Sequence, residues 1–188
     1  PAMTREEAVQ ALEVGIDIAC KEIEKGVNLL GTGEMGIGNT TPSTAILSVL
    51  GGIDPLEITG RGAGVGKGGL EHKAAVIRKA IELNRPDRGD GIDVLAKVGG
   101  LEIAGMAGVM LGAAANRVPV VVDGYISSVA ALIAAAMEPK VKDYMIPSHA
   151  SMEPGGKKAS ELLGIKPMLQ MEMCLGEGSG AALAFPII

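Results

Sequence analysis

Residues 118–123 read Val-Pro-Val-Val-Val-Asp and are the stretch that decides the fold. A continuous run of β-branched residues ending in a carboxylate is typical of a strand buried on both faces, as in a parallel sheet. On either side of it we predict two more short strands, over residues 27–30 and 143–147, with helical segments between them. Strands that alternate with helices predict an α/β fold, a doubly wound, mostly parallel sheet with helices on both faces, similar to a Rossmann fold.

Caps and apolar spacing predict the helices. Thr4 followed by Glu7 is a capping box, which begins a helix that Gly26 ends. Pro42 lies in the first turn of the second helix, where an N–H group is not needed. No internal repeat, linker or low-complexity segment is found, so we predict a single α/β domain over residues 1–188. The helices are predicted over residues 4–25, 40–50, 70–83, 90–98, 100–115, 124–137 and 155–163, with a short one after residue 180.

Composition narrows the class of protein. Hydrophobic residues make up 47% and charged residues 21% of the 188 residues, which is typical of a globular chain. The net charge of −5 argues against nonspecific binding of nucleic acid, so we expect no nucleic-acid partner. With no Trp, one Phe and two Tyr, the chain has few aromatic faces, and a ring-shaped ligand would lie between aliphatic and Met side chains.

No signal for a membrane span, a metal site or a disulfide is found in the sequence. The most apolar stretches, 100–115 and 118–137, are explained as buried elements, because the first is short and Asp123 lies inside the second. Cys20 and Cys174 lie on apolar stretches without pairing or metal-ligand spacing, so we predict buried free thiols in a reducing compartment. No signal peptide is visible, and we expect a cytoplasmic protein.

The first of three glycine-rich loops covers residues 31–39, Gly-Thr-Gly-Glu-Met-Gly-Ile-Gly-Asn. Its letters match the dinucleotide fingerprint, but the acidic residue downstream, Asp54, lies in a Gly-Gly-Ile-Asp-Pro turn and not at the end of a second strand. Small residues before a helix expose backbone N–H groups, which favour an anion. We therefore predict an anion site here; a tight turn without a ligand is the alternative.

The second glycine loop, residues 60–69, resembles a P-loop only in part. Arg61 stands where the first glycine of a P-loop is required, and Gly68 replaces the hydroxyl residue that would bind magnesium. These differences argue against nucleoside triphosphate hydrolysis. Lys73, one turn into the next helix, could still reach a phosphate held by this loop, although a solvated lysine is the more common interpretation of such a residue.

The third loop, Gly176-Glu-Gly-Ser-Gly180, sets one carboxylate among glycines and between two apolar segments. Glycine neighbours leave Glu177 open to a ligand, and apolar flanks would remove water, which makes a carboxylate a better general base. A glutamate that merely suits the helix dipole explains the pattern equally well. His149, in the polar loop 148–156, could be a catalytic acid, but such a histidine is more often bonded locally.

Five longer motifs stand in order along the chain: GEMGIGNTTP (33–42), GRGAG (60–64), GGLEIAGMAG (99–108), VPVVVDGYIS (118–127) and LGEGSGAALA (175–184). With them, essentially all 188 residues resemble the nicotinate-nucleotide–dimethylbenzimidazole phosphoribosyltransferase family. The resemblance implies an enzyme of cobalamin synthesis that transfers the 5-phosphoribosyl group of nicotinate mononucleotide to 5,6-dimethylbenzimidazole, giving α-ribazole 5′-phosphate and nicotinate. It also implies a homodimer that needs no metal, no cofactor and no diphosphate donor.

The resemblance assigns roles to individual residues. Glu177 resembles the general base that takes a proton from the benzimidazole nitrogen, and Leu175 beside it would touch the benzimidazole ring. Glu34 and Gly36 resemble part of the ribose-phosphate site. The residues that resemble phosphate contacts are Gly62, Lys73 and Ser151.

Members of this family are considerably longer, and their N-terminal part helps to form the pocket for the aromatic base. We expect that part to be absent here, since the chain begins at Pro1 and enters a helix almost at once. Two alternatives stay open: the same chemistry with a purine or phenolic acceptor, or a nucleotide-binding fragment without turnover on its own.

Overall fold

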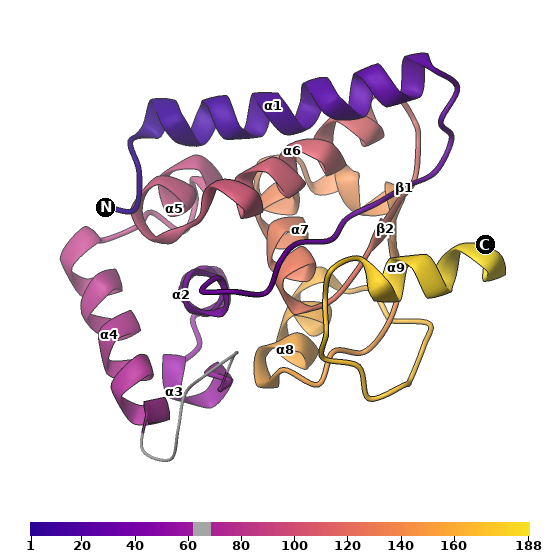
Figure 1. Cartoon of the computed structure of the whole chain (residues 1–188). Helices are drawn as coiled ribbons and strands as arrows, with labels where there is room; N and C mark the ends of the chain where they lie inside the picture. Colours follow the sequence, from indigo (N-terminus) through magenta and orange to yellow (C-terminus); the bar gives the residue numbers. More distant parts are fainter. Residues whose placement is uncertain (62–68) are drawn as a thin grey trace.

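The computed structural model describes residues 1–61 and 69–188 and shows helices arranged around a small sheet (Figure 1). The long helix α1 runs alongside α6 on one side of the molecule, and the chain ends beside the strands. In chain order the elements are α1 (Arg5–Glu24), β1 (Leu30–Gly31), α2 (Thr40–Gly51), α3 (Pro55–Ile58), α4 (Gly69–Asn84), α5 (Gly91–Val98), α6 (Leu101–Ala115), β2 (Val120–Val122), α7 (Tyr125–Met137), η1 (Pro139–Tyr144), β3 (Met145–Pro147), α8 (Pro154–Leu163), α9 (Ser179–Ala184) and η2 (Phe185–Ile187).

Within the described residues, the sheet consists of three parallel strands in the order β1-β2-β3. β2 is central, because Val120 pairs with Leu30 of β1 and with Met145 of β3. The stretch that decided the fold in the sequence is therefore the middle of the sheet, and the predicted parallel α/β arrangement is confirmed.

The two outer strands are shorter than predicted, for local reasons. The predicted strand 27–30 is mostly wrong: the Val27 N–H still donates to the last turn of α1, and pairing begins only at Leu30. In the predicted strand 143–147 the first two residues belong to η1, a 3₁₀ helix that begins at Pro139. Proline fits the first turn of a helix, and the chain extends only after that turn ends.

Helices cover both faces of the sheet, as predicted. Val120 and Val122 of β2 pack into the main core on the side of α7, whereas Val121 packs against Ala181 and Ala184 of α9. Successive side chains of a strand point to opposite faces, so one uninterrupted run of valines serves two cores.

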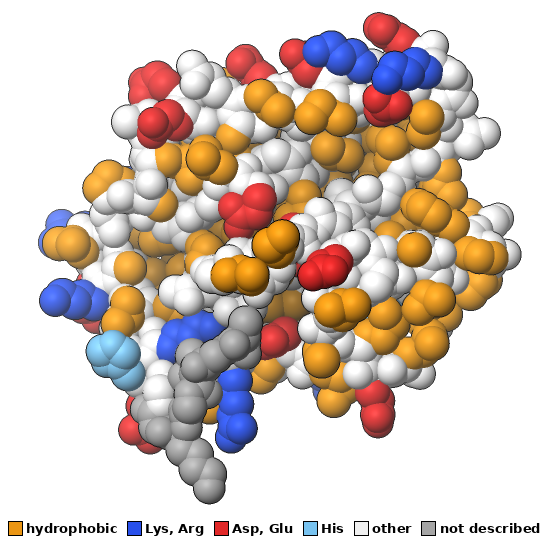
Figure 2. Space-filling view, in the orientation of Figure 1, with side chains coloured by type: hydrophobic (Ala, Val, Ile, Leu, Met, Phe, Trp, Pro, Cys, Tyr) orange, Lys and Arg blue, Asp and Glu red, His pale blue; other side chains and the backbone are white. Residues whose placement is uncertain are grey.

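The exterior beside α9 is apolar. Figure 2 shows hydrophobic side chains gathered on the side of the molecule that carries α9 in Figure 1. The exposed large side chains of α9 and η2 are Leu183, Phe185 and Ile187. An exposed apolar patch of this kind is typical of a surface that another chain or segment covers.

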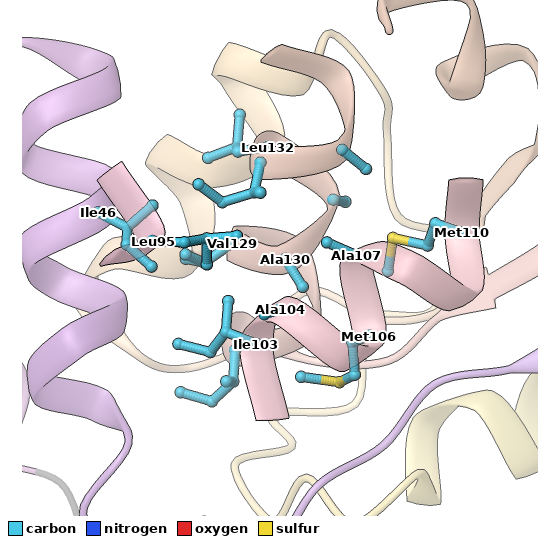
Figure 3. Close-up of a cluster of buried hydrophobic side chains, with 14 of the residues drawn as sticks. Ile46, Leu95, Ile103, Ala104, Met106, Ala107, Met110, Val129, Ala130 and Leu132 are labelled. Carbon is cyan, nitrogen blue, oxygen red and sulfur yellow. The ribbon is translucent and has the colours of Figure 1, made fainter. Parts of the chain in front are cut away.

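The main core is aliphatic, as the composition predicts. In Figure 3 buried side chains of α6 and α7 meet, and Ile46 of α2 and Leu95 of α5 lie beside them. Ile103 and Met110 of α6 and Val129 of α7 are completely buried. This core holds α7, and with it the segment that follows β2, in a fixed position.

α1 packs on α6 at backbone distance. A Cβ atom added at Gly15 would lie 2.0 Å from Gly105 O, and one added at Gly108 would lie 2.0 Å from Leu12 O. These distances are far below a normal carbon–oxygen contact, so the two helices can approach this closely only because both positions lack a side chain.

The predicted helices are all present, with ends that differ by one or two residues. The sequence did not predict α3, which Asp54 begins by accepting the Leu56 N–H (2.8 Å) while it pairs with Arg78 (2.6 Å). Asp54 is therefore a helix cap, consistent with its place in a turn. Across residues 1–61 and 69–188, no helix combines the length and apolar character needed to cross a membrane.

Candidate active site

A cavity of about 740 Å³ lies at the carboxyl end of the sheet, where ligands bind in open α/β folds. The segments that follow all three strands reach it: residues 34–37 after β1, 124–126 after β2 and His149 after β3. Residues 173–177, which precede α9, form another part of its wall. The sheet thus gathers segments that are far apart in the sequence around one space.

Five of the residues assigned from the sequence line this cavity. They are Glu34, Gly36, Ser151, Leu175 and Glu177. They come from three separate segments, so the fold brings together residues that the sequence analysis could only name individually.

Lys73 does not line the cavity itself, but it contacts a residue that does. Its Nζ donates to Thr40 Oγ1 (2.8 Å) and to Gly60 O (3.2 Å), and Thr40 itself lines the cavity. Lys73 is thus bonded within the protein and partly buried, so the interpretation as a solvated lysine is wrong. Gly62, the other residue assigned to the second glycine loop, lies outside the described residues.

Glu177 lies in a turn with left-handed backbone at three successive residues. The angle φ is +75° at Gly176, +58° at Glu177 and +75° at Gly178. Left-handed backbone is unfavourable for a residue with a Cβ atom. Of these three residues only Glu177 has a Cβ atom, so only Glu177 is strained by this conformation.

The prediction that apolar flanking segments exclude water from Glu177 is wrong for the described part of the chain. Its side chain is exposed, and its neighbour Leu175 is 62% exposed. Apolar neighbours in sequence remove water only when the fold packs them over the carboxylate, and residues 1–61 and 69–188 do not do so.

The first and third glycine loops are in backbone contact. The Glu177 N–H donates to Glu34 O (3.0 Å). A Cβ atom at Gly33 would lie 2.3 Å from Gly178 N, so the loops meet this closely only because Gly33 has no side chain. This contact sets the two glutamates on adjacent parts of the cavity wall.

Residues 1–188 match the family described as Phosphoribosyltransferase. The chain belongs to this family. A nicotinate-nucleotide–dimethylbenzimidazole phosphoribosyltransferase from Alkaliphilus metalliredigens is 73% identical, and one from Clostridioides difficile is 61% identical, each over 188 residues.

The crystal structure of CobT from Thermus thermophilus superimposes on the chain with a TM-score of 0.94 at 41% sequence identity. It is matched over 100% of this chain and 56% of its own. The two relatives named above are likewise matched over 54% of their length. The chain therefore spans about half the length of the phosphoribosyltransferases that it resembles.

In this family member, Glu34 is a partly buried glutamate of the cavity, as Glu153 is. Burial raises the pKa of Glu34, and the negative charges of Asp123 and Glu177 add to the rise. A hydrogen bond from Asn39 Nδ2 to the Glu34 carboxylate opposes the rise. Glu34 therefore takes up a proton at a higher pH than an ordinary glutamate does.

The electrostatics of Lys73 and Tyr125 also follow from burial. Burial lowers the pKa of Lys73, which the charge of Glu153 partly offsets. Burial raises the pKa of Tyr125, and a hydrogen bond with Thr44 opposes that rise. Tyr125 lines the cavity as a neutral hydroxyl, whereas Lys73 is the one cation among the residues assigned from the sequence and contacts the cavity-lining Thr40.

Two buried polar residues, Asp123 and His149, lie close together after β2 and β3, and His149 lines the cavity. Asp123 is 2% and His149 is 4% exposed, and the His149 Nδ1 lies 3.9 Å from the Asp123 carboxylate. Ser148 Oγ donates to Asp123 O (2.9 Å), so its proton is used and His149 Nδ1 donates to that hydroxyl (3.0 Å). In the neutral ring Nε2 is then the acceptor. The interpretation of His149 as locally bonded is confirmed.

The cysteines are placed differently from the prediction. Cys20 is only partly buried and Cys174 is exposed, so the predicted burial of both thiols is wrong. Cys174 lies in the cavity wall, since the segment before α9 turns its side chains outward instead of packing them in a core. Within the described residues, no three His, Cys, Asp or Glu side chains lie together as a metal ion would require.

Proposed function

We propose that the protein containing this chain transfers the 5-phosphoribosyl group of nicotinate mononucleotide to 5,6-dimethylbenzimidazole. The observation that carries the proposal is the contact between two glycine loops, which places Glu34 and Glu177 in the wall of one cavity. The Lys73 ammonium contacts Thr40, which belongs to the same wall. The names of the relatives from Alkaliphilus metalliredigens and Clostridioides difficile state the same reaction. The glycine loops offer backbone N–H groups to a phosphate, and a carboxylate is at hand for a proton.

In the proposed reaction, a ring nitrogen of the benzimidazole forms a bond to C1 of the ribose. The bond between C1 and the nicotinate nitrogen breaks, and its electron pair stays with that nitrogen. Attack opposite the leaving group turns a β-glycoside into an α-glycoside, so the products are α-ribazole 5′-phosphate and nicotinate. The proton on the second benzimidazole nitrogen is lost, and we assign Glu177 as the general base that accepts it.

The binding roles follow from chemistry and place. We assign Lys73 and Ser151 to the phosphate, because an ammonium and a hydroxyl can both donate to it. We assign Glu34 and Gly36 to the ribose-phosphate site and Leu175 to the aromatic ring. The exposed side chain of Leu175 has apolar surface that a flat ring could cover.

The test is to mix the full-length protein that contains these residues with nicotinate mononucleotide and a base, and to quantify released nicotinate chromatographically. We expect release with 5,6-dimethylbenzimidazole and none without a base. Arms with adenine and with a phenol test the alternative acceptors. The absence of nicotinate with all bases would contradict the proposed reaction.

A second candidate, for residues 1–188 alone, is nucleotide binding without turnover. The observation that favours it is the exposure of Glu177 and Leu175, which leaves one side of the base site open in this part of the chain. Nucleotide binding without nicotinate release by this chain, beside turnover by the full-length protein, would support it.

The surroundings of the chain are part of the same proposal. We propose a cytoplasmic homodimer that binds no nucleic acid, in which residues 1–188 form one domain. One hydrophobic core with members from Ala8 to Leu163 supports the single domain, and the net charge of −5 supports the lack of a nucleic-acid partner. The exposed apolar patch of α9 and η2 supports contact with another chain. Light scattering of the full-length protein would measure the oligomeric state.

A further inference from the structure

Asp123 is a buried carboxylate that the proposed reaction does not use. It follows directly after β2, and its side chain is 1% exposed. Its Oδ2 accepts the N–H of Gly178 (3.0 Å), and its Oδ1 accepts the N–H groups of Gly180 (2.7 Å) and Ala181 (3.1 Å). A carboxylate taken out of water needs donors, and three backbone N–H groups supply them here.

These three N–H groups lie within the four residues that follow Glu177. The Glu177 N–H donates to Glu34 O (3.0 Å), and the Ser179 N–H donates to Gly176 O (3.0 Å). Every N–H group from residue 177 to residue 181 therefore has a partner, and Asp123 provides the partner for three of them. The turn is held by the first glycine loop on one side and by Asp123 on the other.

We propose that Asp123 is a positioning residue that holds Glu177 in place for proton transfer. Left-handed backbone at a glutamate, with φ of +58°, persists only where the surroundings fix it. The bond to Glu34 O fixes the peptide before Glu177, and the bond from Gly178 to Asp123 fixes the peptide after it. The proposal rests on the proposed function of Glu177 as general base.

The first test is Asp123→Asn in the full-length protein. An amide keeps the size and one acceptor oxygen, which still serves Gly180 and Ala181, but it turns an NH2 group toward the Gly178 N–H. We expect kcat to fall roughly 10- to 100-fold, as for loss of a hydrogen bond to a charged group, with KM for nicotinate mononucleotide nearly unchanged. The control is Ser127→Ala, which removes another buried hydrogen-bonding group near the end of β2 without touching the turn, and which should keep its kcat.

A double-mutant cycle shows whether Asp123 acts through Glu177. If it does, Asp123→Asn combined with Glu177→Gln is no slower than Glu177→Gln alone, because the group that Asp123 positions is already lost. Losses that multiply would overturn the proposal, since they would show that the two residues act independently. A fall in kcat of the Ser127→Ala control equal to that of Asp123→Asn would overturn it as well.

Amide hydrogen exchange tests the contact without any activity measurement. In the wild-type protein the Gly178 amide should be protected although it lies in a turn, and Asp123→Asn should speed its exchange. An unprotected Gly178 amide in the wild type overturns the proposal even if the variant does not fold. Turnover by Glu177→Gln at the wild-type rate would instead contradict the proposed function of Glu177. In that case the exchange rate of the Gly178 amide would still show whether Asp123 fixes the turn.

Discussion

At the scale of single residues, Glu34 and Glu177, which both line the cavity, differ in their surroundings. Glu34 is partly buried and bonded to Asn39, whereas Glu177 is exposed and has glycines on both sides. A carboxylate that another side chain already holds is suited to binding, and one that is free is suited to accepting a proton from an incoming base. This difference supports the division of roles proposed above.

Glu177→Gln should slow phosphoribosyl transfer while nucleotide binding stays nearly intact. Glutamine keeps the size of the side chain but cannot accept the benzimidazole proton, and loss of a general base typically costs on the order of 10²–10⁴-fold in rate. Turnover is measured as nicotinate release by the full-length protein. Glu172→Gln is a matched control, because Glu172 is also an exposed glutamate with left-handed backbone (φ +50°) in the segment before α9. A near-wild-type rate for Glu177→Gln would contradict the assignment.

Lys73→Ala should weaken nucleotide binding more than it weakens binding of the free base. The ammonium is partly buried, and a charge-assisted hydrogen bond contributes roughly 1.5–3 kcal/mol. Calorimetric titrations of nicotinate mononucleotide and of the base measure the two losses. Lys79→Ala, an exposed lysine on the same helix α4, is the control. Equal losses for nucleotide and base would show that Lys73 is not a phosphate ligand.

The same lysine sets a pH dependence. Burial lowers the pKa of Lys73 below its ordinary value, so the charged form is complete only below that lowered pKa. Nucleotide affinity should therefore decline with rising pH sooner than for an exposed lysine, and Lys73→Ala should remove this part of the decline. Titrations across the alkaline range measure it, and a decline that Lys73→Ala leaves unchanged would assign it to another group.

At the scale of elements, the pairing of α1 with α6 depends on particular glycines. Gly108 lies against the backbone of α1, whereas a Cβ atom at Gly105, three residues earlier on α6, would find its nearest neighbour, Ala11 O, at 3.9 Å. One helix therefore offers two glycines with opposite surroundings.

Gly108→Ala should lower the free energy of unfolding by about 1–3 kcal/mol or more, because the new methyl group forces the two helices apart. Gly105→Ala should leave stability unchanged or raise it by up to about 1 kcal/mol, because alanine favours helix and the new methyl group makes only an ordinary van der Waals contact with Ala11 O. Urea unfolding of both variants measures the difference. Equal effects of the two substitutions would show that the close approach of α1 and α6 is not what requires glycine.

The elements also show what the sequence can and cannot predict. Helices were predictable because their signals are local, such as the capping box at Thr4, which the structure contains. The start of β1 was not, because it depends on pairing with a strand far along the chain. The glycine loops and Glu177 could be identified as motifs, but the bond between Asp123 and Gly178 joins residues 55 positions apart, and no local pattern records it. The exposure of Glu177 is likewise decided by what packs over it.

At the scale of the whole molecule, residues 1–188 alone should bind benzimidazoles poorly even if they bind phosphate. Leu175 and neighbouring Met side chains could cover one side of a ring, but they are exposed, and few aromatic side chains are present to cover the other. An open site leaves ligand surface in water, and burial contributes only about 25 cal/mol per Å² of apolar area. Titration of 5,6-dimethylbenzimidazole into this chain and into the full-length protein compares the affinities. Equal affinities would show that the base site is complete within these residues.

The pairing of β1 with β2 has a consequence for how the chain is made. Thr32, just after β1, bonds to Val121 of β2, 89 positions later. At ribosomal rates of about 5–20 residues per second, β1 waits roughly 4–18 s before its partner strand has been synthesised. During that interval the apolar face of α1 (Ala8, Leu12 and Ala19) has no α6 to cover it. Helix α1 is thus made well before the helix that covers it, so the nascent chain carries an uncovered apolar helix face until residues 101–115 have been synthesised.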